Sequence, residues 1–246
     1  MMILQHSWRL ILLCISFLCI ASPWAYSHER PHQKVELTAK ERAFIKLYPE
    51  ITLASGDSFE PFTILNADGS ISGFDADLLD IISQRTGLKI NLTLGDWAEV
   101  QDQAQQRLYD GLSTATVSDQ RKQFFNFSEP YSKLFSVVLV KKGNPQKITT
   151  IENLNGKRIA MQRSNQAFEK MAKETGMDME PVYLSTIHDL IKSVVSGESD
   201  FTILDESYAY SAQLVGLDKF IEVAFILGEK PFDLASALRN DQPELA

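Results

Sequence analysis

The stretch Thr114-Ala115-Thr116-Val117-Ser118-Asp119-Gln120-Arg121 lies where an extended segment passes into a short helical turn. Thr114 and Thr116 are two positions apart, so their hydroxyls point to the same side of an extended chain. Arg121 follows five residues later, and its guanidinium offers two parallel donors to a planar carboxylate. Free amides at the start of a helix would add further donors. The stretch fits either a carboxylate site or a polar turn with a surface arginine, and the sequence around it must decide.

Alternating strand and helix patterns surround this stretch. Before it, apolar and turn signals predict a strand at 51–54, a helix from 74 that is closed by Gly87, a strand at 88–94 and a helix at 97–108. After residue 150 the same rhythm returns, with strands at 158–162, 181–184 and 201–204 and helices between and after them. This alternation is typical of a mainly parallel sheet covered by helices. We therefore expect an α/β fold of two similar halves, with a long strand at 134–140 between them and a return strand at 231–238.

Polar side chains gather where the strands of both halves end. Thr114 and Thr116 end a strand of the first half, while Ser164, Asn165 and Asp205 follow strands of the second. Ligands of such sheets bind outside the carboxyl ends of the strands. We expect these residues to contribute to one site. Asp205 could instead cap the helix that follows it, and Ser164 or Asn165 could be a plain helix cap.

Composition excludes several classes of function. The chain has 246 residues, a net charge of −8 and no basic run, which argues against binding to nucleic acid or to an anionic membrane surface. The four histidines are scattered and suggest no metal site. Phosphate-loop, nucleophile-elbow and zinc-protease motifs are missing from the sequence. We expect a protein that is not an enzyme and needs no cofactor.

The first residues predict export. Arg9 precedes an apolar run from Leu10 to Ile20, and small residues follow up to Ser27, which is typical of a secretory signal peptide at 1–27. The run is short for a membrane span, although an uncleaved anchor in the inner membrane is the alternative. Residues 28–50 form a lead-in whose helix starts at a capping box of Thr38 and Glu41. We expect a periplasmic protein.

An ordered set of motifs carries a family resemblance. The chain resembles the family 3 bacterial extracellular solute-binding proteins, two-lobed periplasmic-binding domains of type 2 that are also called Venus flytraps. The motifs run through residues 50–240 in the family's order: Phe59, Pro61 and Phe62; Asp68, Gly69, Gly73, Phe74, Asp75 and Asp77; Trp97 and Asp110; Arg121, Phe127, Pro130 and Tyr131; Leu154, Gly156 and Lys157; and Ser196, Gly197 and Asp200.

The resemblance implies lobes and roles. Lobe 1 is expected at 51–138, lobe 2 at 139–228 and a return to lobe 1 at 229–246, with two hinge strands between the lobes. In this family Thr114, Thr116 and Arg121 match positions that hold the ligand's α-carboxylate, and Ser164 and Asn165 complete that clamp. Asp205 matches the position that takes the α-ammonium, and Phe59 matches an aromatic that packs on the ligand, although Phe59 could equally belong to the core. An amino acid or a close analogue is the implied ligand.

Two departures from the family pattern leave alternatives open. Arg163 stands where a small residue is usual, and it could crowd the cleft or meet a second carboxylate. The family's last helix on lobe 1 is missing after Ala246, so a truncated or split receptor is one interpretation. The expected partners are therefore an ABC permease, for uptake, or the membrane and kinase or cyclase parts of a sensor. A dehydratase acting on cyclohexadienyl acids is the third hypothesis on this fold.

Overall fold

The structure is a computed structural model that describes residues 34–163 and 176–246. The predicted signal peptide at 1–27 and the predicted ligand residues Ser164 and Asn165 lie outside the described residues. In the two described ranges, none of the helices combines the length and the apolar character needed to cross a membrane.

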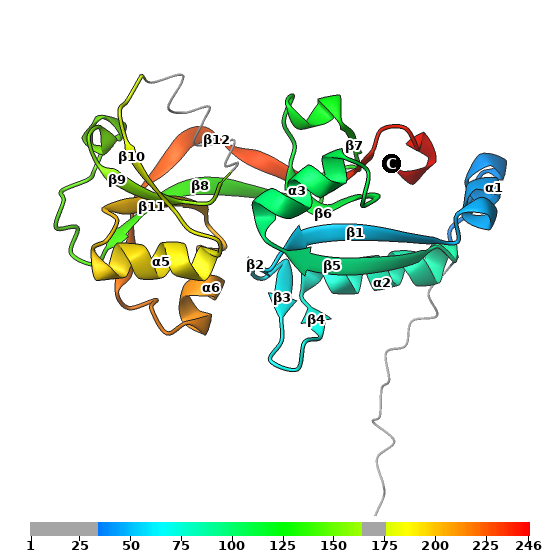
Figure 1. Cartoon of the computed structure of the whole chain (residues 1–246), viewed down its shortest axis with the longest axis horizontal. Helices are drawn as coiled ribbons and strands as arrows, with labels where there is room; N and C mark the ends of the chain where they lie inside the picture. Colours follow the sequence, from blue (N-terminus) through cyan, green and yellow to red (C-terminus); the bar gives the residue numbers. More distant parts are fainter. Residues whose placement is uncertain (1–33, 164–175) are drawn as a thin grey trace, which may run out of the picture. The chain divides into compact units, whose positions relative to one another are not determined.

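The described chain builds one nine-stranded sheet, a small three-stranded sheet and flanking helices (Figure 1). The described α-helices are α1 Ala39–Leu47, α2 Phe74–Thr86, α3 Trp97–Gln105, α5 Ile187–Ser196 and α6 Tyr208–Leu214, with short 3-10 helices η1 Arg121–Gln123, η2 Ile151–Leu154 and η3 Pro243–Leu245. The strands are β1 Glu50–Gly56, β2 Ser58–Phe59, β3 Thr63–Leu65, β4 Ile71–Ser72, β5 Lys89–Gly95, β6 Gly111–Thr116, β7 Phe125–Phe127, β8 Ser132–Lys141, β9 Arg158–Met161, β10 Glu180–Tyr183, β11 Phe201–Asp205 and β12 Ile221–Arg239.

Two long strands connect the lobes. The order in the large sheet is β10-β9-β11-β8-β12-β6-β1-β5, so β8 and β12 lie between two groups of three parallel strands. β8 pairs antiparallel with β11, and β12 pairs antiparallel with both β8 and β6. The predicted lobe limits at 138/139 and 228/229 fall inside these two strands. The α/β, two-lobed fold expected from the sequence is confirmed.

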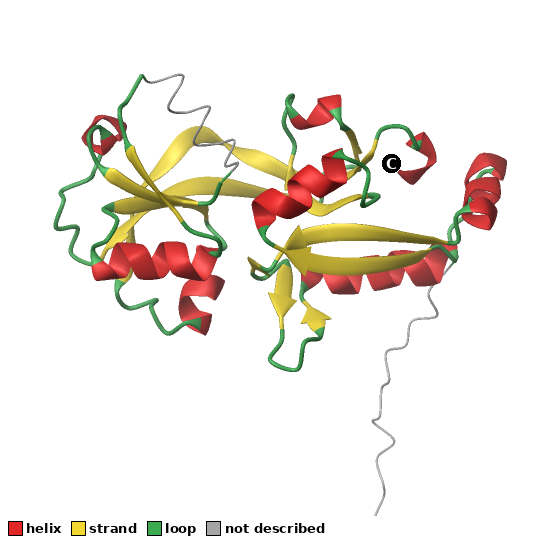
Figure 2. Ribbon diagram, viewed as in Figure 1, coloured by secondary structure: helices red, strands yellow, loops and turns green. Residues whose placement is uncertain are grey.

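In the first lobe, α2 and α3 pack on β1, β5 and β6 (Figure 2). α2 ends at Gly87, which adopts the left-handed conformation that glycine accepts without strain. α3 begins at Asp96, whose side chain accepts hydrogen bonds from the amides of Ala98 and Glu99. Two clusters of buried apolar residues hold these layers together, one around Leu53 and Leu79 and one around Val100 and Phe125.

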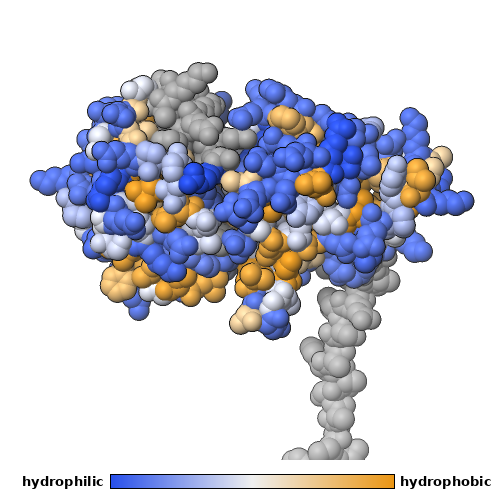
Figure 3. Space-filling model, viewed as in Figure 1, coloured by the Kyte–Doolittle hydropathy of each residue, from blue (hydrophilic) through white to orange (hydrophobic). Residues whose placement is uncertain are grey.

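The second lobe repeats the arrangement with β9, β10 and β11, and its described helices are α5 and α6. The N-cap of α5 is Thr186, whose hydroxyl accepts a hydrogen bond from the amide of Asp189. The buried face of α5 includes Leu190 and Ile191, which pack in one cluster with strand residues of the lobe. Some apolar surface stays exposed along α6 and the loop after it, at Tyr210, Leu214 and Phe220. Figure 3 shows apolar atoms along that edge of the lobe.

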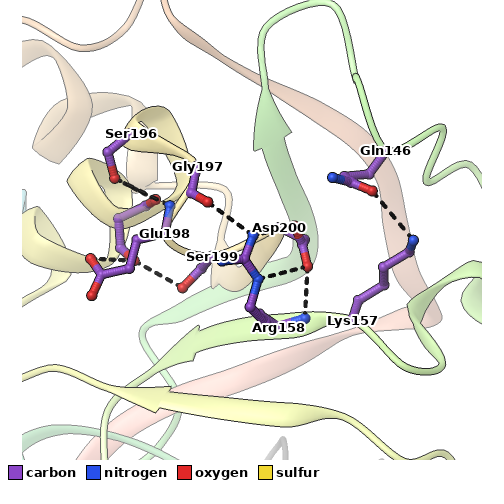
Figure 4. A network of polar contacts seen from close by, with 9 residues as sticks. Gln146, Lys157, Arg158, Ser196, Gly197, Glu198, Ser199 and Asp200 are labelled. Carbon is purple, nitrogen blue, oxygen red and sulfur yellow. Dashed lines mark hydrogen bonds and ion pairs between the residues drawn. The ribbon is translucent and has the colours of Figure 1, made fainter.

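The strand ends that lie opposite the predicted site carry an ion pair. Asp200, just before β11, accepts the backbone amide of Arg158 at 2.9 Å and its guanidinium at 2.8 Å (Figure 4). The same guanidinium donates to the carbonyl of Gly197 after α5. Arg158 therefore ties β9, β11 and the end of α5 together, and Asp200 has a structural role at the start of β11.

Candidate ligand-binding site

Arg121 begins the 3-10 helix η1, five residues after the end of β6, and is buried, with 6% of its surface exposed. Its guanidinium donates to the Thr116 carbonyl at 3.0 Å and to Oε1 of Gln101 at 2.6 Å. The guanidinium carbon also lies 5.4 Å from the centre of the Trp97 ring, a cation–π contact. Nε of Arg121 is buried and has no hydrogen-bond partner in the described structure. These contacts fix the guanidinium but leave donors unused, because arginine carries five N–H groups.

The charge of Arg121 lacks an acidic partner within the described part of the chain. Burial lowers the pKa of Arg121 to about 10, and no nearby carboxylate opposes this shift. The side chain remains a cation at neutral pH. A buried cation without an anion is costly, so an anion from outside the chain would be stabilised strongly here. The arrangement suits the carboxylate of a bound solute.

Thr114 belongs to a buried network that sequence reasoning missed. Its hydroxyl donates to the Asp75 carboxylate at 2.6 Å and also contacts the hydroxyl of Tyr131. The Ser113 hydroxyl donates to the same carboxylate at 2.5 Å. Asp75 lies in the first turn of α2, but it is 1% exposed and its carboxylate accepts these bonds from β6. Because Thr114 has one hydroxyl proton and Asp75 uses it, contact between Thr114 and a ligand carboxylate stays a prediction.

Burial raises the pKa of Asp75 to about 6, although the hydroxyls of Ser113 and Thr114 oppose the shift. Its protonation state therefore changes near neutral pH. When Asp75 holds the proton itself, it can donate to one hydroxyl and free that group to donate elsewhere. Ser113 and Thr114 of β6 are thus hydrogen-bonded to an acid, Asp75, that titrates near neutral pH.

Thr116 and Phe59 keep positions consistent with a site but are not joined to one another. Thr116 is half-buried at the carboxyl end of β6. Phe59 is half-buried, its ring stacks on Phe62 at 4.9 Å, and it packs against the buried cluster of the second lobe that includes Ile187. Phe59 thus lies where the lobes meet, and both roles considered from the sequence, ligand wall and core, remain open.

Asp205 is the acid that ends β11 in the second lobe. One of its oxygens accepts hydrogen bonds from the amide of Ser207 at 2.9 Å and from the Ser207 hydroxyl, which forms a turn just before α6; the N-cap of α6 is Ser207 itself, without a side-chain cap bond. Burial raises the pKa of Asp205, and Glu206 adds to the shift. No described cation pairs with it. Like Arg121, Asp205 is a largely covered charge without a counter-ion in the described chain.

A cavity of about 130 Å³ opens between the start of α3 and the second lobe. The first lobe contributes Asp96, Trp97 and Ala98, and the second contributes Gln162, Arg163, Tyr183, Leu184 and Ser185. Arg163 is exposed, and its guanidinium carbon lies 4.8 Å from the Tyr183 ring centre. Of the predicted ligand residues that the structure describes, Arg163 alone lines this cavity, while Trp97 touches both the cavity and Arg121. The structure therefore adds Trp97 to the candidate site.

Neither the aromatic pair after Arg121 nor the metal-ligating side chains that the structure describes add a further site. Phe124 is 40% exposed, whereas its neighbour Phe125 is buried. In the residues that the structure describes, no three His, Cys, Asp or Glu side chains form a group that could hold a metal ion.

The sequence matches two family descriptions. Residues 51–171 match the bacterial extracellular solute-binding proteins, family 3, and residues 122–224 match the NMT1/THI5 like family. Together the matched ranges include Arg121, Arg163 and Asp205. The resemblance noted in the motifs is confirmed.

One curated relative is a probable histidine-binding protein of Neisseria gonorrhoeae, 34% identical over 107 residues. That alignment covers 42% of this chain and 38% of the relative. Several curated relatives are matched over only 38 to 55% of their own length. Their names describe binding of amino acids, and none of these names describes a catalyst.

Solved structures share the fold. The periplasmic domain of BvgS from B. pertussis superposes with a TM-score of 0.74 at 22% identity, covering 85% of this chain and 41% of that one. AncCDT-1, described as an ancestral amino acid-binding protein and a precursor of cyclohexadienyl dehydratase, superposes with a TM-score of 0.69 at 26% identity. That superposition covers 84% of this chain and 88% of the other.

Proposed function

Since the chain belongs to the bacterial extracellular solute-binding proteins of family 3, we propose that it binds an amino acid or a close analogue between its two lobes. The carboxylate of the solute binds Arg121, and its ammonium binds Asp205. Thr116, Phe59 and the segment with Ser164 and Asn165 complete the site, as the sequence predicts. Binding takes place in the periplasm and closes the lobes around the solute.

One observation carries this proposal. The first lobe covers a cation that has no anion, and the second lobe covers an acid that has no cation, within the described chain. Asp205 is the last residue of β11, and Arg121 lies five residues beyond the end of β6; each of these strands pairs in its lobe's parallel group. A zwitterion supplies both missing charges at once. Contacts of this kind, made to both lobes only when the lobes are closed, shift the population toward the closed form.

The proposal is tested by a thermal-shift panel of the twenty amino acids. A bound solute raises the melting temperature by mass action. We expect one amino acid, or a few related ones, to stabilise the wild-type protein and the control variant Arg158→Gln, but not Arg121→Gln. Equal stabilisation of wild type and Arg121→Gln would overturn the carboxylate assignment, and a panel without any shift would overturn the choice of amino acids.

We propose that Arg163 determines the selectivity of the site among solutes. It lines the cavity beside Trp97, and Asp96 lines the opposite wall. A second carboxylate on the solute meets Arg163, so glutamate and aspartate are the first solutes to compare with neutral amino acids. The cavity's 130 Å³ is of the size that holds a small organic group.

Sensing is the second candidate use of the same site. The superposition on the BvgS periplasmic domain covers 85% of this chain, and BvgS is named a virulence sensor. In that case solute binding serves as the input of a membrane receptor with a kinase or cyclase part. The genomic neighbourhood separates the two uses: permease and ATPase genes support uptake, whereas a receptor frame supports sensing.

Catalysis is the least supported use. AncCDT-1 is described as a precursor of a dehydratase, so the fold alone does not exclude chemistry. Asp205 and Glu206 are neighbours in sequence and offer no evident acid–base pair. Incubation of the purified protein with prephenate and arogenate is expected to give no product.

A further inference from the structure

Glu60 joins the two lobes and directly follows Phe59. It lies between β2 and β3 of the first lobe, and 3% of its surface is exposed. Its Oε2 accepts a hydrogen bond from the Ser211 hydroxyl on α6. Its Oε1 lies 3.0 Å from the buried Nε2 of His188 on α5, which is an ion-pair distance without aligned hydrogen-bond geometry, and this nitrogen has no hydrogen-bond partner in the described structure. Both carboxylate oxygens therefore meet the second lobe, and Glu60 contacts two of its helices at once.

This carboxylate keeps its charge although it is buried. Burial acts to raise the pKa of Glu60, but contacts with His188 and Ser211 outweigh burial and leave the pKa below its ordinary value. In return, contact with Glu60 raises the pKa of His188. A buried carboxylate without partners would be costly, so Glu60 is stable here because the second lobe supplies the partners.

The other groups around His188 do not replace Glu60. His188 lies in the first turn of α5, where the helix dipole disfavours a cation. From the same helix Lys192 acts to lower the pKa of His188 and Asp189 acts to raise it, while Glu60 is the acid that reaches it from another element. When the lobes separate, Glu60 and His188 are both hydrated, and the pKa of His188 returns toward about 6.5.

We propose that Glu60, His188 and Ser211 form a proton-dependent latch that favours closure of the lobes without any solute. We call this group the Glu60 latch. Its contacts join the two lobes and are lost when the lobes open, so they stabilise the closed form selectively. Phe59 precedes Glu60 and packs on the second-lobe cluster, so the latch also fixes this aromatic beside the cleft. The inference goes beyond the proposed function because it concerns the empty protein.

The direction of the pH dependence follows from the two shifts. His188 has a higher pKa in the closed form, so the latch acts fully below about pH 6.5 and weakens as the pH rises through the closed-form pKa. Glu60 has a lower pKa in the closed form, so the latch also weakens in acid, as the pH falls below about 4.3 and through that lowered value. The closed form is favoured most between these limits.

The test measures the separation of the lobes in the solute-free full chain by single-pair fluorescence energy transfer. Dyes are attached at Arg85→Cys on α2 and at Lys219→Cys in the second lobe, both exposed positions. Cys14 and Cys19, the natural cysteines, are replaced by serine. We expect the ratio of open to closed molecules to rise from pH 6 to pH 8. The rise should be about tenfold for each unit by which closure raises the pKa of His188.

Variants separate the latch from a merely structural role. Glu60→Gln and His188→Gln remove the charges, and both should open the empty protein at pH 6 and abolish its response between pH 6 and pH 8. Ser211→Ala should open it less and keep the response. Glu99→Gln, an exposed acid on α3, is the matched control and should behave as wild type.

The outcomes distinguish this inference from the proposed function. Arg121→Gln should lose solute binding yet keep the pH response of the empty protein. An unchanged dye separation across pH 6 to pH 8 in wild type would overturn the latch, whatever the solute panel shows. So would a pH response that survives in His188→Gln, a position with 26% of its side chain exposed at which glutamine should not prevent folding.

Discussion

Each lobe contains an arginine near the end of a central strand, and the two arginines differ in whether an acidic residue pairs with them. Arg158 of the second lobe lies at the start of β9 and pairs with Asp200 at 2.8 Å, and this contact raises the pKa of Arg158. Arg121 of the first lobe lies after the end of β6 without an acidic partner, and burial lowers its pKa. One guanidinium completes the fold, while the other is held ready for an anion that the described chain does not provide.

The strand starts, in contrast, are built alike in the two lobes. Asp110 before β6 accepts the amide of Thr52 at 2.8 Å, and Asp200 before β11 accepts the amide of Arg158 at 2.9 Å. Each aspartate amide in turn donates to the carbonyl of that same neighbouring residue at 2.8 Å. The lobes repeat one another at the ends that stabilise the sheet and diverge at the carboxyl ends, where the solute is proposed to bind.

The largest expected effect is on solute affinity. Arg121→Gln should weaken binding about 100-fold or more, because two charge-assisted hydrogen bonds of about 1.5 to 3 kcal/mol each are lost. Its melting temperature without solute should stay the same or rise, since an unpaired buried charge is removed. Titration calorimetry and differential scanning calorimetry measure the two quantities.

Arg158→Gln should give the reverse pattern and so sharpen the comparison. It should lower the melting temperature, because Asp200 loses its guanidinium partner, and leave the affinity unchanged. If both variants lost affinity equally, the contrast between the two arginines would be wrong.

The second effect concerns Asp75, the buried acid behind β6. Its folded-state pKa of about 6 lies above the unfolded value of about 3.9, so the folded form holds the proton longer. Stability from this group is therefore fully present below about pH 4 and is lost as the pH rises to about 6, by roughly 2 to 3 kcal/mol at most. Urea unfolding at pH 4.5 and pH 7 should show this loss in wild type and a smaller loss in Asp75→Asn. An equal pH dependence in both proteins would contradict the assignment.

The third effect compares the two strand starts. Asp110→Ala and Asp200→Ala each leave a backbone amide without its acceptor and should each cost about 1 to 2 kcal/mol of unfolding free energy. Neither change should alter solute affinity, because both aspartates lie at the amino ends of their strands and the solute is proposed to bind at the carboxyl ends. If one substitution lowered the unfolding free energy strongly and the other did not, the two strand starts would not be equivalent.

The smallest effect is on selectivity. Arg163 is exposed and stacks on Tyr183, so Arg163→Ala should reduce affinity for glutamate and aspartate several-fold, in the range of about 1 kcal/mol for an exposed charge pair. Affinity for neutral amino acids should change little. A matched loss for all solutes would indicate that Arg163 shapes the cavity wall and does not read a second carboxylate.

Features that depend on near neighbours in sequence were predictable. The Thr38 and Glu41 capping box begins α1, and Gly87 ends α2, as short-range patterns indicated. Arg121 was recognised as a candidate because its spacing from the threonines suits a carboxylate. The partners of the site were not predictable in this way. Asp75 and Thr114 are 39 positions apart, and Glu60 and Ser211 are 151 apart, so pairing depends on how the lobes fold and close.

The central claim is that Arg121 binds the solute's carboxylate, and a double cycle in a calorimeter tests it most directly. Once the panel names an amino acid, its affinity and that of its carboxamide analogue are measured on wild type and on Arg121→Gln. We predict that the carboxamide binds wild type about 100-fold more weakly than the acid but binds Arg121→Gln about as well as the acid does. Equal discrimination between acid and carboxamide by both proteins would contradict the account.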